Sequence, residues 1–201
     1  MTIYAIVNNL LSPESPDASN PVWTIISPAA ILQGGNPFFV PDFASCYEAR
    51  TALAVRIGKL GKGISPRFVG RYIESAAPAI LFVASDLLQS LRENGLPWTQ
   101  AISYDRALAL GKFTHLSLDE CKKCEVSLSL ESDNANVFEN RTAESLCLDV
   151  EKTVAAISRD NALKMGDIIL FGISAVGPKV HPDIRTHLRM NGCDSLAFNI
   201  R

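Results

Sequence analysis

The stretch from Ala79 to Trp98, AILFVASDLLQSLRENGLPW, constrains the fold more than any other part of the chain. Its first six residues form an uninterrupted apolar run that is too short for a good helix and is typical of a buried strand. Ser85 and Asp86 follow, and both residue types favour the N-cap of a helix. The amphipathic segment after them ends at Gly95, and Pro97 prevents its continuation. The stretch therefore predicts a buried strand that leads directly into a helix, an arrangement in which many folds place a pocket.

Composition limits the classes of function. A chain of 201 residues with 47% hydrophobic and 20% charged residues can form one sizeable core, so we expect a single domain over residues 1–201. The formal net charge of -2 gives no long-range attraction to nucleic acid or to an anionic membrane, although it does not exclude a local basic patch. We therefore expect no nucleic acid and no membrane among the partners, and no run approaches the roughly 18 apolar residues of a membrane span. The N-terminus lacks the pattern of a secretory signal and the cysteines are odd in number, so we expect reduced thiols in a cytoplasmic protein.

Apolar periodicity and turn residues predict the other elements. Ser65 and Pro66 are expected to start a helix that runs to about Ala76, because serine caps a helix and proline favours its first turn. Alternation of apolar and polar residues predicts a strand over 125–130 with one buried face. The remaining expected elements are strands over 3–7, 23–26, 47–59 and 168–172, a loop over 10–21, a hairpin turn over 133–136, a helix over about 148–162, and one or two strands in 178–201.

Several of these segments resemble the fumarylacetoacetate hydrolase family. The family has an Ala-Arg-Asp-Leu-Gln helix start followed by a Gly-Leu-Pro-Trp turn, which Ala84, Asp86, Leu87 and the turn 95–98 match. The LAVRIGK sequence at 53–59 strengthens the resemblance, which covers roughly residues 3–182. It implies an α+β fold of curved, mostly antiparallel sheets that form a roll around one pocket, with a few short helices. It also implies a homodimer.

The resemblance further implies a site for Mg²⁺ or Mn²⁺, and here this sequence departs from the family. Family members place two Glu residues on alternate positions of one strand and an Asp on the strand before the helix. The aligned positions hold Arg50, Ala52 and Leu81, which changes three negative charges to one positive charge. In an alternative alignment with a bulge after Glu48, the strand positions are Glu48 and Arg50. Since Asp86 is better explained as an N-cap, we expect no metal cofactor.

Other positions that carry the family's chemistry are also changed. Hydrolases of the family use a His-Glu pair from an N-terminal lid as a general base, whereas the histidines here are all late, at His115, His181 and His187. Positions that contact substrate in the family hold Leu88, Ile102 and Ile173. We therefore expect that apolar side chains, together with Leu81, fill the former polar pocket.

Arg50 leads to a more specific hypothesis. A guanidinium near the former ion position could bind a carboxylate or phosphate through two hydrogen bonds, with Glu48, Ser85 and Asp86 as further candidate ligand contacts. The alternative is a structural arginine that is solvated or paired with Glu48 or Asp42.

Two functions of different class remain open from the sequence. The first is a divergent family member that is non-catalytic or binds a small acid without metal, alone or as a subunit beside an active paralogue. The second is an active metal-dependent hydrolase, isomerase or decarboxylase of a small oxo-acid or diketo-acid, with Glu48 and Asp86 as displaced ligands. Cys121 and Cys124 have a metal-like spacing, but structural zinc needs four ligands, so we expect free thiols.

Overall fold

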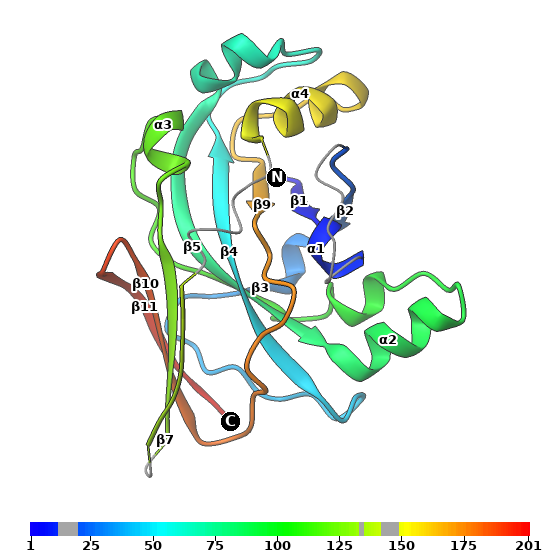
Figure 1. The fold of residues 1–201 in the computed structure, drawn as a ribbon, viewed down its shortest axis with the longest axis vertical. Helices are drawn as coiled ribbons and strands as arrows, with labels where there is room; N and C mark the ends of the chain where they lie inside the picture. The colour runs from blue at the N-terminus through cyan, green and yellow to red at the C-terminus, as the bar shows by residue number, and fades with distance from the viewer. Residues whose placement is uncertain (12–19, 133–134, 142–148) are drawn as a thin grey trace.

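The computed structural model describes residues 1–11, 20–132, 135–141 and 149–201 (Figure 1). Some predicted features lie wholly or partly outside the described residues. They are the loop expected over 10–21, the hairpin turn at 133–136, the start of the helix expected at 148, and Cys147.

Two sheets form the body of the described chain. The larger sheet has the order β2-β1-β9-β4-β5-β6-β3, in which only the pairs β1–β9 and β3–β6 are parallel, and the smaller sheet β11-β10-β7-β8 is antiparallel throughout. The larger sheet contains β1 (Ile3–Ile6), β2 (Trp23–Ile26), β3 (Ile31–Leu32), β4 (Tyr47–Ile57), β5 (Ile73–Ala84), β6 (Leu108–Leu110) and β9 (Ile168–Phe171). The smaller sheet contains β7 (Val126–Ser132), β8 (Ala135–Arg141), β10 (Ile184–Met190) and β11 (Cys193–Ile200).

Helices are short and lie around the sheets. The α-helices are α1 (Asn8–Leu11), α2 (Ser85–Glu93), α3 (Leu118–Cys121) and α4 (Val150–Asp160), and the 3₁₀ turns are η1 (Pro28–Ala30), η2 (Pro66–Arg71) and η3 (Thr99–Ala101). No helix in the described parts of the chain is long and apolar enough to cross a membrane.

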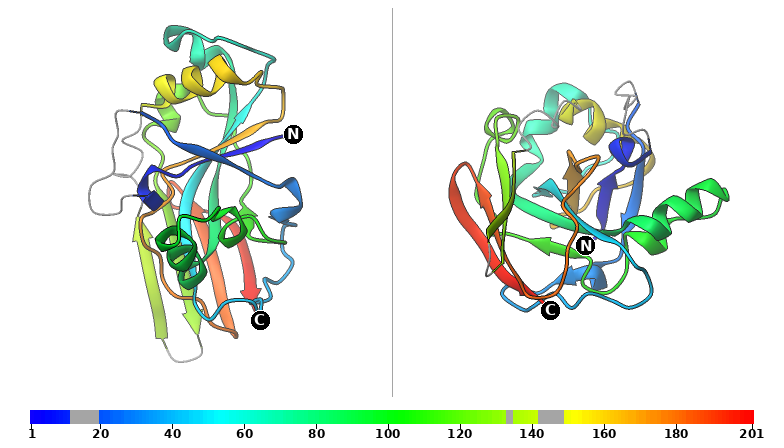
Figure 2. Two further views of the ribbon diagram at one scale, coloured as in Figure 1. Left: turned by 90° about the vertical axis from the view of Figure 1, so that its right-hand side faces the viewer. Right: turned by 60° about the horizontal axis from the view of Figure 1, so that its bottom comes forward.

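The two sheets pack face to face around a shared core. The long, curved strands β4 and β5 run through the centre of the molecule, and β4 contacts β7 while β5 contacts β10 (Figures 1 and 2). Phe82 of β5 stacks on Phe38 with ring centroids 3.8 Å apart, and its edge meets Phe198 of β11 at 6.2 Å. The predicted fold class, α+β with curved and mostly antiparallel sheets, is confirmed.

The segment before the central strand differs from the prediction. The helix expected from Ser65 to about Ala76 is a 3₁₀ turn that ends at Arg71, and the Ser65 side chain makes no capping hydrogen bond. The strand expected from Ala79 already begins at Ile73, because β4 pairs with it along its whole length. Cross-strand pairing outweighs the local preference for a helix here.

The junction of β5 and α2 is confirmed in position and corrected in detail. The N-cap is Ala84, without a side-chain hydrogen bond, so the expectation that Ser85 or Asp86 caps the helix is wrong. At the other end, Gly95 adopts a positive φ of 65° and its N–H donates to the carbonyl of Arg92 at 3.0 Å. A left-handed glycine at this position terminates the helix, as predicted.

Candidate functional site

The three positions that the family resemblance aligns with metal ligands lie together on one face of the larger sheet. Arg50 of β4 is directly opposite Leu81 of β5. Ala52 lies two residues further along β4 and therefore on the same face. Between Tyr47 and Arg56 the pairing of β4 with β5 is unbroken, so the bulge that the alternative alignment needed after Glu48 is absent.

Arg50 is held by a carboxylate and by a backbone carbonyl. Its Nε and Nη2 atoms lie 3.1 and 3.0 Å from Glu48 Oε2, and its Nη1 atom donates to the carbonyl of Ala175 at 2.6 Å. Only 7% of the residue is exposed. These contacts use three of the five N–H donors of the guanidinium. The ion pair with Glu48, one of the alternatives that the sequence left open, is therefore present. The guanidinium has N–H donors beyond these three.

Residues 173–180, which we call the strap, lie against the start of β4 and contact Arg50. It runs antiparallel to the start of β4, with hydrogen bonds from Ser174 N to the carbonyl of Thr51 at 3.0 Å and from Val180 N to the carbonyl of Tyr47 at 2.9 Å. Gly177 N also donates to Glu48 Oε2 at 3.3 Å. A Cβ atom on Gly177 would lie 2.3 Å from the carbonyl oxygen of Ala49, so only glycine fits there.

A second arginine, Arg92, lies near Arg50 and affects its pKa. Burial lowers the pKa of Arg50 below its ordinary value, Glu48 opposes this shift, and the positive charge of Arg92 adds to it. Arg92 extends from α2, and its Nη1 atom donates to the carbonyl of Leu10 at 2.7 Å.

The side chains of Ser85 and Asp86 bind backbone groups around the start of α2. Asp86 Oδ2 accepts a hydrogen bond from Ser45 N at 2.8 Å and Oδ1 accepts one from Leu87 N at 2.9 Å, while Ser85 binds the carbonyl of Cys46. Burial raises the pKa of Asp86, but the backbone donors outweigh it and the net pKa is lowered. Asp86 follows the Tyr47–Ala84 pair, three steps or roughly 10 Å along the strands from Arg50. The two side chains therefore do not form one site.

The cysteine pair is buried next to β7. Cys121 and Cys124 are free thiols, and Asn191 Nδ2 approaches Cys124 Sγ at 3.8 Å. Burial raises the pKa of Cys121 to about 12 and raises that of Cys124. Protonated buried thiols are poor nucleophiles, in agreement with a structural role.

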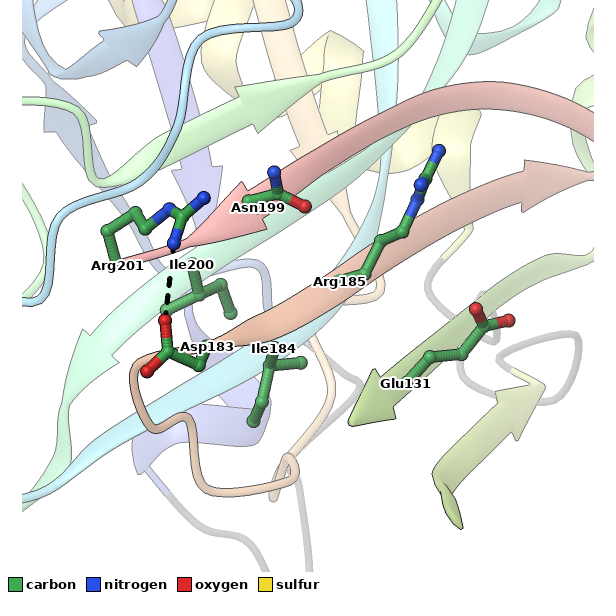
Figure 3. Close-up of a pocket in the computed structure, with 7 residues that line it drawn as sticks. All are labelled: Glu131, Asp183, Ile184, Arg185, Asn199, Ile200 and Arg201. Atoms are coloured by element: carbon green, nitrogen blue, oxygen red, sulfur yellow. Dashed lines mark hydrogen bonds and ion pairs between the residues drawn. The ribbon is translucent and has the colours of Figure 1, made fainter. Parts of the chain in front are cut away.

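The tail forms a hollow that sequence reasoning missed. It has a volume of about 390 Å³ and opens on the smaller sheet (Figure 3). Its charged side chains are Glu131, Asp183, Arg185 and Arg201, which balance in sign, and Arg201 pairs with Asp183 at 3.3 Å. The alternation of polar and apolar residues over 184–190 indicates a strand with one outward face, but it does not predict a hollow on that face.

Comparison with known proteins identifies the family. The family model described as the fumarylacetoacetate (FAA) hydrolase C-terminal domain matches residues 6–192. The chain belongs to the fumarylacetoacetate hydrolase family. A mitochondrial oxaloacetate tautomerase of Bos taurus is 24% identical over 190 residues, which is 93% of this chain and 84% of that protein. A mitochondrial oxaloacetate decarboxylase of Dictyostelium discoideum is 26% identical over 149 residues, 74% of this chain and 67% of that protein.

Solved structures share the fold of this fumarylacetoacetate hydrolase family member. A fumarylpyruvate hydrolase of Pseudomonas aeruginosa in complex with Mn²⁺ and pyruvate has a TM-score of 0.80 and 20% identity, covering 100% of this chain and 89% of that one. A 5-carboxymethyl-2-hydroxymuconate delta-isomerase of Mycobacterium smegmatis has a TM-score of 0.76 and 23% identity, covering 99% of this chain and 76% of that one.

The residues of this family member do not fit the divalent ion that the family implies. Arg50, Ala52 and Leu81 offer no oxygen ligand, and Mg²⁺ requires several. Within the described residues, no three His, Cys, Asp or Glu side chains come together to hold a metal. The four apolar replacements are all buried members of the continuous core: Leu81, Leu88, Ile102 and Ile173.

Proposed function

We propose that this chain is a member of the fumarylacetoacetate hydrolase family that binds a small carboxylic acid without a divalent metal ion. In this proposal Arg50 takes over the electrostatic role of the cation. The observation that carries it is the buried guanidinium of Arg50, opposite Leu81 and beside Ala52, which has N–H donors beyond its contacts with Glu48 and Ala175. A guanidinium matches a carboxylate with two parallel hydrogen bonds.

The class of ligand follows from the relatives. Their names specify oxaloacetate, and the fumarylpyruvate hydrolase was solved with pyruvate. Each of these molecules pairs a carboxylate with a neighbouring carbonyl. Oxalate and pyruvate are therefore suitable probes for an arginine anchor in the present chain.

Thermal unfolding with oxalate or pyruvate, in the presence of EDTA, tests the proposal. An acid at about 100 times its Kd should stabilise the folded state by about 2.7 kcal/mol, and Arg50→Ala should abolish the shift. Arg50→Lys keeps the charge but loses the fork, so it should weaken the effect, whereas the exposed Arg185→Ala serves as the matched control. Stabilisation that requires Mg²⁺ or Mn²⁺, or that survives in Arg50→Ala, would overturn the proposal.

A second candidate is a metal-dependent enzyme that acts on an oxo-acid. The family match over residues 6–192 and the tautomerase and decarboxylase relatives favour it. Of the two ligand candidates from the sequence, Glu48 lies beside Arg50, whereas Asp86 is roughly 10 Å away along the strands and binds the backbone N–H groups of Ser45 and Leu87. Turnover of oxaloacetate that depends on Mn²⁺ and is lost in Glu48→Gln would support it, and EDTA-insensitive acid binding without turnover would exclude it.

The assembly proposed for either function is a homodimer, as the family resemblance implies. Sedimentation velocity at micromolar concentration tests this assembly, and a monomer would contradict it.

A further inference from the structure

Two turns pair at one end of the molecule and project from it. The first is residues 58–63, directly after β4, and the second is residues 162–166, directly before β9, at the end where α4 lies (Figure 1). Gly61 N donates to the carbonyl of Leu163 at 3.0 Å, and Leu163 N donates to the carbonyl of Gly61 at 2.9 Å. We call the outward residues of the two turns, Lys59, Leu60, Lys62, Lys164 and Met165, the basic tip.

The basic tip exposes two large apolar side chains on a fixed backbone. Leu60 is 71% exposed and Met165 is 73% exposed. The turns are fixed by hydrogen bonds from Gly63 N to the carbonyl of Ser158 at 2.7 Å and from Lys164 N to Asp167 Oδ2 at 2.8 Å. Single exposed apolar residues are ordinary, but two on paired turns with lysines beside both are a specific arrangement.

The two turns and the segment that follows the first of them carry only positive charge, although the whole chain has a formal charge of -2. Residues 58–72 and 161–166 contain five basic residues and no Asp or Glu: Lys59, Lys62, Arg67, Arg71 and Lys164. None of the five takes part in an ion pair between described residues. Arg67 and Arg71 lie over the ring of Phe68, 4.5 and 4.6 Å from its centroid. The cations are thus available to an external anionic surface.

We infer that the basic tip is a peripheral docking site for the anionic surface of a lipid bilayer. The lysines would lie at the phosphate level, and Leu60 and Met165 would enter the headgroup layer between them. A nucleic acid backbone offers no apolar counterpart for these two side chains. Protein interfaces are depleted in lysine and enriched in aromatic residues, whereas the basic tip has three lysines and no aromatic residue. The low net charge of the chain concerns long-range attraction and does not oppose this short-range contact.

Cosedimentation with vesicles tests the inference. We expect the protein to bind vesicles of phosphatidylcholine with about 30% phosphatidylserine, and not vesicles of phosphatidylcholine alone. Each lysine near such a surface contributes about fivefold in affinity, so the loss of two weakens binding about 25-fold. Lys59→Glu/Lys164→Glu also reverses both charges and should weaken binding by at least this factor. Leu60→Ser/Met165→Ser should weaken binding severalfold at both 0.1 and 0.5 M salt, because salt does not screen the insertion of apolar side chains into the bilayer.

A matched control separates the basic tip from overall charge. Lys112→Glu/Lys123→Glu makes the same change in net charge at two exposed lysines outside the two turns, and it should bind like the wild type. Equal weakening in this control, or no binding of the wild type to phosphatidylserine vesicles, would overturn the inference. Binding of polyglutamate instead of vesicles, with loss in Lys59→Glu/Lys164→Glu, would assign the basic tip to an acidic protein segment and also overturn it.

Discussion

The ion pair between Glu48 and Arg50 is buried, and this determines what its loss would cost. The two side chains are 16% and 8% exposed. Glu48→Gln leaves the Arg50 guanidinium charged and without its carboxylate, which we expect to lower the free energy of unfolding by about 3 kcal/mol. Urea unfolding measures the change. Asp194→Asn, which removes the carboxylate of the exposed pair with Arg189, is the control and should cost at most about 1 kcal/mol. Equal costs would show that solvent screens the Glu48–Arg50 pair.

At the level of single residues, local contacts were predictable and distant ones were not. The partner of Arg50 was open between Glu48 and Asp42, and the structure selects Glu48 because residues two apart on a strand share a face. The contact of Asp86 with Ser45 N joins residues 41 positions apart, so the sequence offered an N-cap or a ligand contact for Asp86 but not this backbone contact. The contact of Arg50 with Ala175 likewise depends on the strap, which no local pattern indicates.

The strap is the element whose position depends most on one glycine. Gly177→Ala would place a methyl group 2.3 Å from the Ala49 carbonyl oxygen and 3.2 Å from Arg50 Cγ, so the strap must move away from β4. We expect a loss of about 1–3 kcal/mol in unfolding free energy and weaker acid binding at Arg50. Gly34→Ala is the control, since a Cβ atom there meets nothing within 4 Å. An unchanged stability of Gly177→Ala would show that the strap shifts without cost.

At the level of elements, the sequence predicted strands with clear alternation and failed where two signals competed. The alternation in β7 and the apolar face of α4 both appear as expected. Before Ala79 the prediction failed, because the Ser65-Pro66 pair favours a helix start whereas the chain forms a short 3₁₀ turn and then enters β5 at Ile73. β5 passes through Pro78, which lies opposite Leu53. Pairing with β4 is a property of the assembled sheet, so a local pattern cannot reveal it.

The whole molecule depends on contact between its two sheets, and Phe82 lies at that contact. Its ring joins Phe38 and Phe198, and the last of these belongs to the smaller sheet. Phe82→Ala should remove about 3–5 kcal/mol of unfolding free energy, because the cavity would lie between the sheets. If residues 1–201 form one domain, the loss must appear in both sheets at once. Far-UV circular dichroism reports both sheets, whereas the fluorescence of Trp23, in β2, and of Trp98 reports the larger sheet and its surroundings.

Coincidence of these two signals decides between one cooperative unit and two. In the wild type and in Phe82→Ala, the urea transitions seen by circular dichroism and by fluorescence should have the same midpoint. Phe39→Ala makes the same chemical change at a side chain that is 55% exposed, and it should shift neither midpoint by more than a small fraction of the Phe82 effect. Separate midpoints would mean that the smaller sheet unfolds alone. The strap and Arg50 would then belong to a unit that is stable without β10 and β11. At urea concentrations that unfold only the smaller sheet, the acid site would remain folded.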